Sequence, residues 1–184
     1  DPGIWVCLDE GCNSNCHGDE WAANAVEKLA TMPIKEGFEW IHRRPRKFQG
    51  IGEGKVATTG KRMLPAAFQL KNSKKILPAA LESHEQKGRH PLLLSGESQG
   101  KLGFVKVMRE GKVYLQDFTS GDSVDELEVC RAAGSGLSVV CVSHFPKWIK
   151  PDMFVEEVGG QNIRVKAEAV AKIQRDETRQ AYKE

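Results

Sequence analysis

The chain has 184 residues, of which 40% are hydrophobic and 28% charged, and its formal net charge is +2. This length and apolar content suit one ordinary domain with a real core, and the nearly balanced charge points neither to a nucleic-acid binder nor to an acidic partner. No apolar run approaches the roughly 20 residues that a transmembrane helix needs, and no basic-then-apolar signal peptide opens the sequence.

Short strands dominate the predicted elements. In chain order we expect a buried strand at 4–8, a helix at 19–31, strands at 38–41, 55–59, 62–70, 74–81 and 92–94, a small helix at 97–102, and a hairpin of strands 104–108 and 113–118. A helix at 124–132, a strand at 137–144, an irregular stretch at 146–160 and a charged helix at 165–182 follow. The helix at 19–31 is predicted because Trp21, Ala25, Val26 and Leu29 share one helical face, and Pro33 ends it. Pro78 indicates a strand at a sheet edge.

Five cysteines at irregular spacings fit reduced thiols better than a disulfide framework. We therefore expect an intracellular, reducing compartment, either the cytosol or the interior of an organelle. The abrupt opening Asp1-Pro2-Gly3, followed at once by a strand, suggests a piece cut from a longer protein.

A metal site is the first functional reading to test, because Cys7, Cys12, Cys16 and His17 lie within eleven residues. A structural zinc site takes four ligands, usually in two close pairs. No second close pair follows, since ten residues separate Cys130 from Cys141. We therefore predict no metal and no cofactor.

Three other motifs carry little chemistry by themselves. The run His42-Arg43-Arg44-Pro45-Arg46-Lys47 could contact phosphates, but no aromatic platform surrounds it, so we expect a solvated loop and no nucleic-acid binding. Ser83-His84-Glu85 and Ser143-His144 have the residue types of a hydrolytic triad, although triad geometry comes from separate loops rather than adjacent residues. The glycine-rich stretch at 50–54 lacks the Lys-Ser/Thr of a phosphate-binding loop.

Taken in order, several segments resemble the retropepsin-like aspartic proteases, the fold of retroviral and retrotransposon proteases and of the DNA-damage-inducible protein family. Val6-Cys7-Leu8-Asp9-Glu10-Gly11-Cys12 resembles the family's apolar strand ending in Asp-Thr/Ser-Gly-Ala, and residues 48–56 resemble its glycine-rich flap and return strand. Residues 91–95 and 101–104 resemble the closing strand and short helix, and the hairpin at 105–115 fits the strand pair that ends the domain. The stretch at 9–13 is also similar to a dinoflagellate group of such domains that carries Asp-Glu-Gly-Cys-Asn.

The resemblance implies a mainly β (α+β) fold: a retropepsin-like acid-protease β-barrel at 1–118 with an inserted helix, then a C-terminal extension at 119–184 with one strand and helices. It implies that Asp9 is the catalytic acid/base and Gly11 the turn that exposes it. The flap over the substrate would be Gly50, Ile51, Gly52, Glu53 and Gly54. Because such a chain supplies only one of the two carboxylates that the reaction needs, the enzyme would be a homodimer.

Glu10 departs from the family pattern, in which a small Thr or Ser hydroxyl bonds across the dimer axis. Extra carboxylates beside the catalytic pair could not all ionise. Either Glu10 turns outward to a cation, or the dimer is built differently, or the pair never forms. We therefore expect no cleavage at neutral pH and at most slight activity near about pH 4 to 5, where Glu10 begins to be protonated. Ser95, with Gly96 next, stands where the family has Gly.

Two functions remain open. The favoured one is a non-catalytic relative that serves as a binding module or structural subunit of a larger assembly. Its partner-binding residues would be Trp148, Ile149, Met153 and Phe154, which lie in an irregular, proline-broken stretch suited to a protein surface. The alternative is a homodimeric aspartic endopeptidase that uses Asp9 from each chain, which requires the two carboxylates to lie about 3 Å apart.

Overall fold

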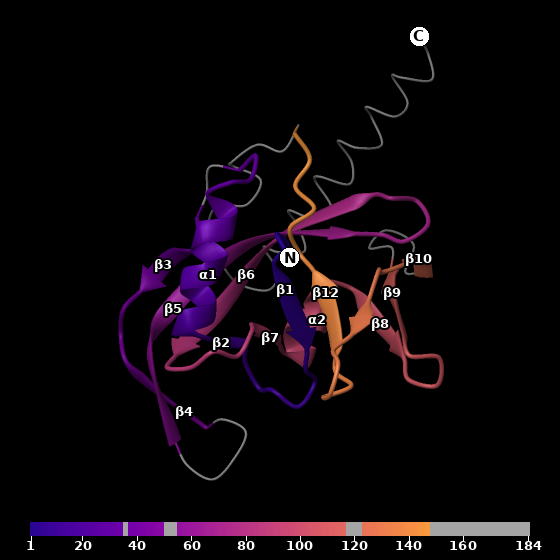
Figure 1. Ribbon diagram of the computed structural model, residues 1–184. Helices are drawn as coiled ribbons and strands as arrows, with labels where there is room; N and C mark the ends of the chain where they lie inside the picture. Colours follow the sequence, from indigo (N-terminus) through magenta and orange to yellow (C-terminus); the bar gives the residue numbers. More distant parts are fainter. Residues whose placement is uncertain (35–36, 50–54, 117–122, 148–184) are drawn as a thin grey trace.

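The computed structural model describes residues 1–34, 37–49, 55–116 and 123–147, and this part of the chain is mainly β, as predicted (Figure 1). Its elements, in chain order, are β1 (Trp5–Leu8), β2 (Cys16–Gly18), α1 (Asp19–Leu29), β3 (Glu39–His42), β4 (Arg46–Gln49), β5 (Lys55–Gln69), β6 (Ile76–Gln86), β7 (Leu93–Leu94), α2 (Gly96–Lys101), β8 (Phe104–Val107), β9 (Lys112–Gln116), β10 (Ser123–Glu126), β11 (Cys130–Arg131) and β12 (Ser138–Cys141). Neither of these two helices is long and apolar enough to cross a membrane.

The strands of the described chain form two sheets. The larger sheet has the order β11-β12-β1-β7-β2-β6-β5-β3, with β4 paired to β5, and the smaller has the order β10-β9-β8. The short strand β7 lies between β1 and β2, parallel to β1 and antiparallel to β2. This arrangement brings the end of β1, the start of β2 and the chain after β7 to one place in the fold.

One hydrophobic core joins the two sheets. Phe68 of β5 packs edge-on against Phe104 of β8, with 5.3 Å between the ring centroids. Leu127, after β10, is 1% exposed and forms an isolated bridge with Leu70 at the end of β5. Val140 of β12 belongs to the same core.

Helix α1 packs across the β2–β6 part of the larger sheet (Figure 1) through short side chains. Ala22, Ala25 and Leu29 are its buried residues, whereas Val26 is 40% exposed, so the prediction that Val26 shares the buried face was wrong. The helix lies close to the sheet because Ala22 and Ala25 are small. At its start, a Cβ on Gly18 would come within 2.3 Å of the carbonyl oxygen of Gly88, so only glycine fits there.

Strands β5 and β6 are longer than predicted. Two strands around Gly60 were expected, but β5 is continuous, and the irregularity is confined to a register shift between Thr58 and Gly60. Strand β6 pairs with β5 along its length, while β2 reaches only its last residues, His84–Gln86. Pro78 pairs with Ala67 of β5. In the described chain, this part of β6 has a neighbouring strand on one side only, and a proline is tolerated at such an edge position.

The helix predicted at 124–132 is wrong, because the chain forms β10 and β11 there. Strand β10 pairs with β9, and the buried carboxylate of Asp125 accepts hydrogen bonds from the turn at Asn72 and Ser73. Strand β12 confirms the predicted strand at 137–144 and pairs antiparallel with β1. The described residues after 118 thus contain three strands where one was expected, and the predicted boundary at 118 falls between two strands that pair with each other. The elements predicted beyond residue 147 lie outside the described residues.

Candidate functional site

Asp9 follows the buried strand β1 directly. Its backbone N–H donates to the carbonyl oxygen of Leu94 at 3.0 Å, which continues the β1–β7 pairing by one residue. The chain then turns, and the N–H of Gly11 donates to Oδ1 of Asp9 at 3.0 Å. Asp9 is half-buried and Gly11 exposed. The predicted positions of Asp9 at a strand end and of Gly11 in the turn are therefore what the structure has, while their catalytic role stays a prediction.

The thiol of Cys12 contacts the second oxygen of the Asp9 carboxylate. Cys12 Sγ lies 3.4 Å from Oδ2 of Asp9. Burial above all, and then the neighbouring Cys16 and Asp9, raises the pKa of the Cys12 thiol to about 12. The thiol therefore stays protonated and acts as the donor. Burial also raises the pKa of Cys16, which is 3% exposed.

Glu10 turns outward to a cation. Its Oε1 lies 2.8 Å from Nζ of Lys106 on β8, and the side chain of Glu10 is 48% exposed. This is the first of the three arrangements expected from the sequence. The pair balances the charge of Glu10 within one chain, which weakens the electrostatic objection to a catalytic pair. It does not replace the small hydroxyl that the family has at this position.

The ring of His17 makes its hydrogen bonds with residues of β6 and not with the cysteines. Its ring is fully buried, with Nδ1 2.8 Å from Oγ of Ser83 and Nε2 3.3 Å from Oε1 of Glu85, and Arg62 donates to the same carboxylate oxygen at 2.8 Å. Burial above all, and then the Arg62 cation, lowers the pKa of His17 to about 3, so the ring is neutral. The tautomer that satisfies both contacts donates from Nε2 to Glu85 and accepts the Ser83 hydroxyl at Nδ1.

This network contains the residue types of a hydrolytic triad, but its members cannot reach a substrate. Ser83 and His17 are both 0% exposed, and Glu85 is 5% exposed. The bridging histidine is His17 rather than His84, the neighbour in sequence. The network therefore ties β2 to β6 inside the fold.

The cysteines and His17 do not converge on a metal. Cys16 and His17 are consecutive in β2, so their side chains point to opposite faces of the sheet. None of the five cysteines forms a disulfide. Among the residues that the structure describes, no group of three or more His, Cys, Asp and Glu side chains is placed to hold a metal ion.

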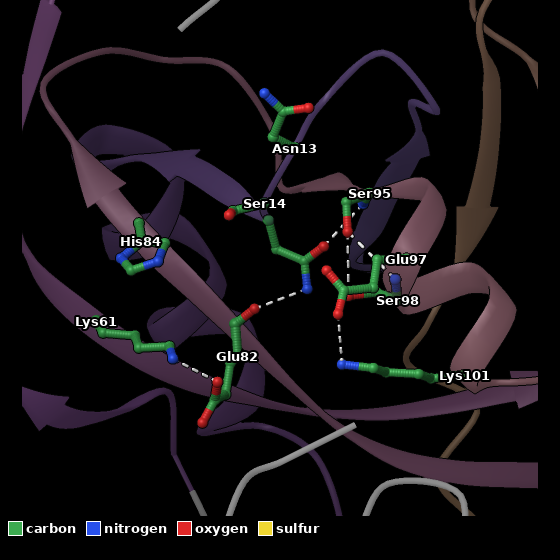
Figure 2. Close-up of a pocket in the computed structure, with 10 residues that line it drawn as sticks. Asn13, Ser14, Lys61, Glu82, His84, Ser95, Glu97, Ser98 and Lys101 are labelled. Atoms are coloured by element: carbon green, nitrogen blue, oxygen red, sulfur yellow. Dashed lines mark hydrogen bonds and ion pairs between the residues drawn. The ribbon is translucent and has the colours of Figure 1, made fainter. Parts of the chain in front are cut away.

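A polar cavity of about 130 Å³ lies beside the Asp9 loop (Figure 2). It is lined by Asn13, Ser14, Asn15, Lys61, Glu82, His84, Ser95, Glu97, Ser98 and Lys101. Asn15 fixes the loop, because its Nδ2 donates to the carbonyl of Glu82 at 2.8 Å and its Oδ1 accepts from the N–H of Ser95 at 2.7 Å. The ion pairs Lys61–Glu82 and Lys101–Glu97 form opposite walls in the view of Figure 2.

Ser95 has a structural role that the sequence did not reveal. It is the N-cap of α2, and its Oγ accepts from the N–H of Ser98 at 3.2 Å. An N-cap serine satisfies a backbone donor that the first helical turn leaves without a partner. The departure from the family's glycine is therefore compatible with the strand-then-helix order at β7 and α2.

The hairpin of β4 and β5 extends toward the same lower end of the molecule as the loop after β1 (Figure 1). Its ladder pairs Arg46–Gln49 with residues 55–58. The predicted flap residues, at 50–54, lie outside the described residues, and so do the predicted partner-binding residues Trp148, Ile149, Met153 and Phe154.

The basic run at 42–47 has an aromatic platform, contrary to the prediction. The guanidinium groups of Arg43 and Arg62 lie 4.8 Å and 3.8 Å from the ring centroid of Trp40. Arg43 of the run is thus part of a stacked cluster, while residues 43–45 form an exposed loop, as expected. The platform could have been found in the sequence, because Trp40 lies only three residues before Arg43.

Comparison of the chain with protein-family models, curated proteins and solved structures gives no match. The functional assignment therefore depends on the geometry of the residues described above.

Proposed function

We propose that the chain is one half of a homodimeric aspartic endopeptidase, in which Asp9 of each chain supplies one of two catalytic carboxylates. The observation that carries the proposal is the Asp9 loop. Its half-buried carboxylate accepts hydrogen bonds from Gly11 and Cys12, while Glu10 is directed to Lys106. A single half-buried carboxylate in a fixed turn suits a site that a second chain completes.

The chain order and topology support a retropepsin-like barrel as the scaffold of this site. The Asp9 loop comes first, then the β4–β5 hairpin, then β7 with α2 directly after it. Strand β7 runs between β1 and β2 and bonds to Asp9 through Leu94. The resemblance to the retropepsin-like family implies the same order of loop, hairpin, strand and helix.

The chemistry requires two Asp9 carboxylates that share one proton. The ionised carboxylate takes a proton from a water molecule, and the protonated one donates a hydrogen bond to the scissile carbonyl oxygen. The water oxygen adds to the carbonyl carbon, the C–N bond breaks, and the leaving amine takes the proton that the first carboxylate removed from the water. Fixed donors from Gly11 and Cys12 would hold each carboxylate in position through these steps.

Cleavage of a fluorogenic peptide library by the purified chain tests the proposal. We expect specific activity to rise with chain concentration, because the site forms only in the dimer. Asp9→Asn should abolish cleavage, while Glu110→Gln, which removes an exposed carboxyl group on the β8–β9 turn, should leave it unchanged.

Mixing the two chains gives the sharper test. An excess of Asp9→Asn chain should suppress the activity of the unaltered chain, because mixed dimers carry only one carboxylate. Activity that is proportional to concentration and unaffected by added Asp9→Asn chain would contradict a shared site.

A second candidate is a binding or structural subunit without catalysis. The observation that favours it is Glu10 itself, because a carboxylate paired with Lys106 cannot make the compact hydroxyl contact across a dimer axis. This candidate predicts no cleavage at any concentration or pH, and no close approach of two Asp9 carboxylates in the assembly.

A further inference from the structure

Positive charge is concentrated around the β4–β5 hairpin. Residues 42–63 contain seven of the 27 Lys and Arg residues and one of the 25 Asp and Glu residues, a net charge of +6, which leaves −4 for the rest of the chain. The small overall charge of +2 therefore conceals an uneven distribution of charge along the sequence, although Glu82 and Glu85 of β6 offset the charges of Lys61 and Arg62. Such a distribution creates a local potential that attracts oppositely charged partners.

Two cations at the base of this hairpin are available to a partner. Arg43 and Arg44 are exposed. Within the described ranges, ion pairs engage Lys61 with Glu82 and Arg62 with Glu85, but none engages Arg43 or Arg44. The charge of these two arginines is therefore not balanced by a neighbouring carboxylate in that part of the chain.

Trp40 orders this surface. Its ring lies under the guanidinium groups of both Arg43 and Arg62, and contacts of this kind hold a planar cation in place. Gly60 of β5 allows the ring to approach, since a Cβ there would lie 2.8 Å from Cζ3 of Trp40. We call Trp40, Arg43, Arg44 and Arg62 the basic hairpin surface.

The hairpin borders the cavity beside the Asp9 loop. Lys61 of β5 lines that cavity together with Asn13 and Ser14, which follow Asp9 by four and five residues (Figure 2). Lys61 precedes Arg62 in the same strand, so the two side chains leave β5 on opposite faces of the sheet. A polypeptide that occupied the cavity near the Asp9 loop would reach the basic hairpin surface by passing the β3 edge of the sheet.

We propose that the basic hairpin surface binds an acidic segment of a polypeptide and thereby selects the substrates presented to Asp9. Guanidinium groups bind carboxylates through paired, charge-assisted hydrogen bonds, and complementary charge speeds encounter. A polypeptide is favoured over nucleic acid because the Trp40 ring already contacts two guanidinium groups, so a stacking base would have to displace one. Cleavage of the bound segment rests on the proposed endopeptidase function, whereas binding of the segment does not.

The test uses the full chain carrying Asp9→Asn, so that binding is measured without cleavage. The probes are two labelled peptides of about twelve residues, identical except that one carries Glu where the other carries Gln, followed by fluorescence anisotropy. We expect the Glu peptide to bind at least about tenfold more tightly, and the difference to shrink when salt is raised from about 50 mM to about 300 mM.

A matched pair of double variants locates the binding surface. Arg43→Glu with Arg44→Glu should weaken binding of the Glu peptide by about tenfold or more. Arg109→Glu with Lys112→Glu makes the same change in net charge on the exposed β8–β9 turn and should alter binding by less than about twofold. Circular dichroism of both variants checks that the fold is retained.

Three results would overturn the inference: equal affinity for the two peptides, equal weakening in both double variants, or tighter binding of a single-stranded RNA of the same length than of the Glu peptide. Binding that follows the expected pattern, together with no cleavage by the unaltered chain, would support the inference and overturn the endopeptidase instead.

Discussion

The thiol of Cys12 donates a hydrogen bond to the carboxylate of Asp9, with 3.4 Å between Sγ and Oδ2. The N–H of Gly11 bonds to the other oxygen of the same carboxylate. Because the pKa of Cys12 is raised to about 12, the thiol remains a donor at acidic and neutral pH. Both oxygens of Asp9 are therefore oriented by groups from its own turn.

Replacing Cys12 with Ala should lower kcat/KM, because the carboxylate of Asp9 then loses one of the two groups that orient it. Cys12→Ser keeps a donor at the same position and should retain most of the activity. Equal kcat/KM in Cys12→Ala and in the unaltered chain would show that the thiol does not position the catalytic carboxylate.

Replacing Glu10 with Thr should strengthen self-association by about tenfold, which corresponds to about 1.4 kcal/mol and is the size of one hydrogen bond. The change removes the Glu10–Lys106 pair and supplies a small hydroxyl at the position where the family uses one. Sedimentation across a range of concentrations measures the effect. Glu10→Gln is the control, because it removes the charge without supplying that hydroxyl. A Glu10→Thr chain that stays monomeric and inert would favour the non-catalytic subunit.

His17 should make the free energy of unfolding fall as the solution is acidified. Its pKa is lowered from 6.5 to about 3 by burial, so between these values the unfolded chain binds a proton that the folded chain does not. Stability from this group is complete above about pH 6.5 and is lost at roughly 1.4 kcal/mol per pH unit below it.

Urea unfolding at several pH values, compared with His17→Gln, isolates this contribution. The variant should be less stable at neutral pH, because Ser83 and Glu85 lose their common partner, and its stability should depend less on pH. NMR of the His17 ring in the unaltered chain gives an independent reading, since the ring should stay neutral to about pH 4. Protonation near pH 6.5 would contradict the buried network.

Asp125→Asn should destabilise the fold by roughly 1–3 kcal/mol near neutral pH. Burial raises the pKa of Asp125, but hydrogen bonds from Ser73, Glu126 and Asn72 outweigh it and lower the pKa from 3.8 to about 2. The folded state therefore favours the ionised carboxylate above about pH 4, and this stabilisation is lost as pH falls through about 2. Thermal unfolding at neutral pH and near pH 2 measures both limits; an equal difference between variant and unaltered chain at the two pH values would contradict this.

Local sequence patterns predicted the elements that are defined by nearby residues. The strand before Asp9, the short strand and helix around Ser95, and the β8–β9 hairpin were all expected. The hairpin turn contains Gly111 at a φ of 65°, a conformation that glycine adopts without strain. In each case the apolar spacing and the turn residues lie within about a dozen positions of one another, which is the range that such patterns can report.

Features that depend on distant partners were missed. Strands β10 and β11 pair with β9 and β12, and this pairing overrides the local helical pattern at 124–132. Glu10 meets Lys106 across 96 positions of sequence, and His17 meets Glu85 across 68. The residue types of the candidate site were visible in the sequence, whereas the partners that set their charge and orientation were not.

Because β1 pairs with β12, the Asp9 loop is completed late in synthesis of the chain. Trp5 lies opposite Cys141, and the N–H of Ile4 donates to Oγ of Ser143, 139 positions away. A ribosome must release almost the whole described chain before β1 gains this neighbour, and contacts between such distant positions slow folding. Nascent chains would therefore carry an unfinished Asp9 loop, so that any cleavage activity would begin only after translation has passed residue 143.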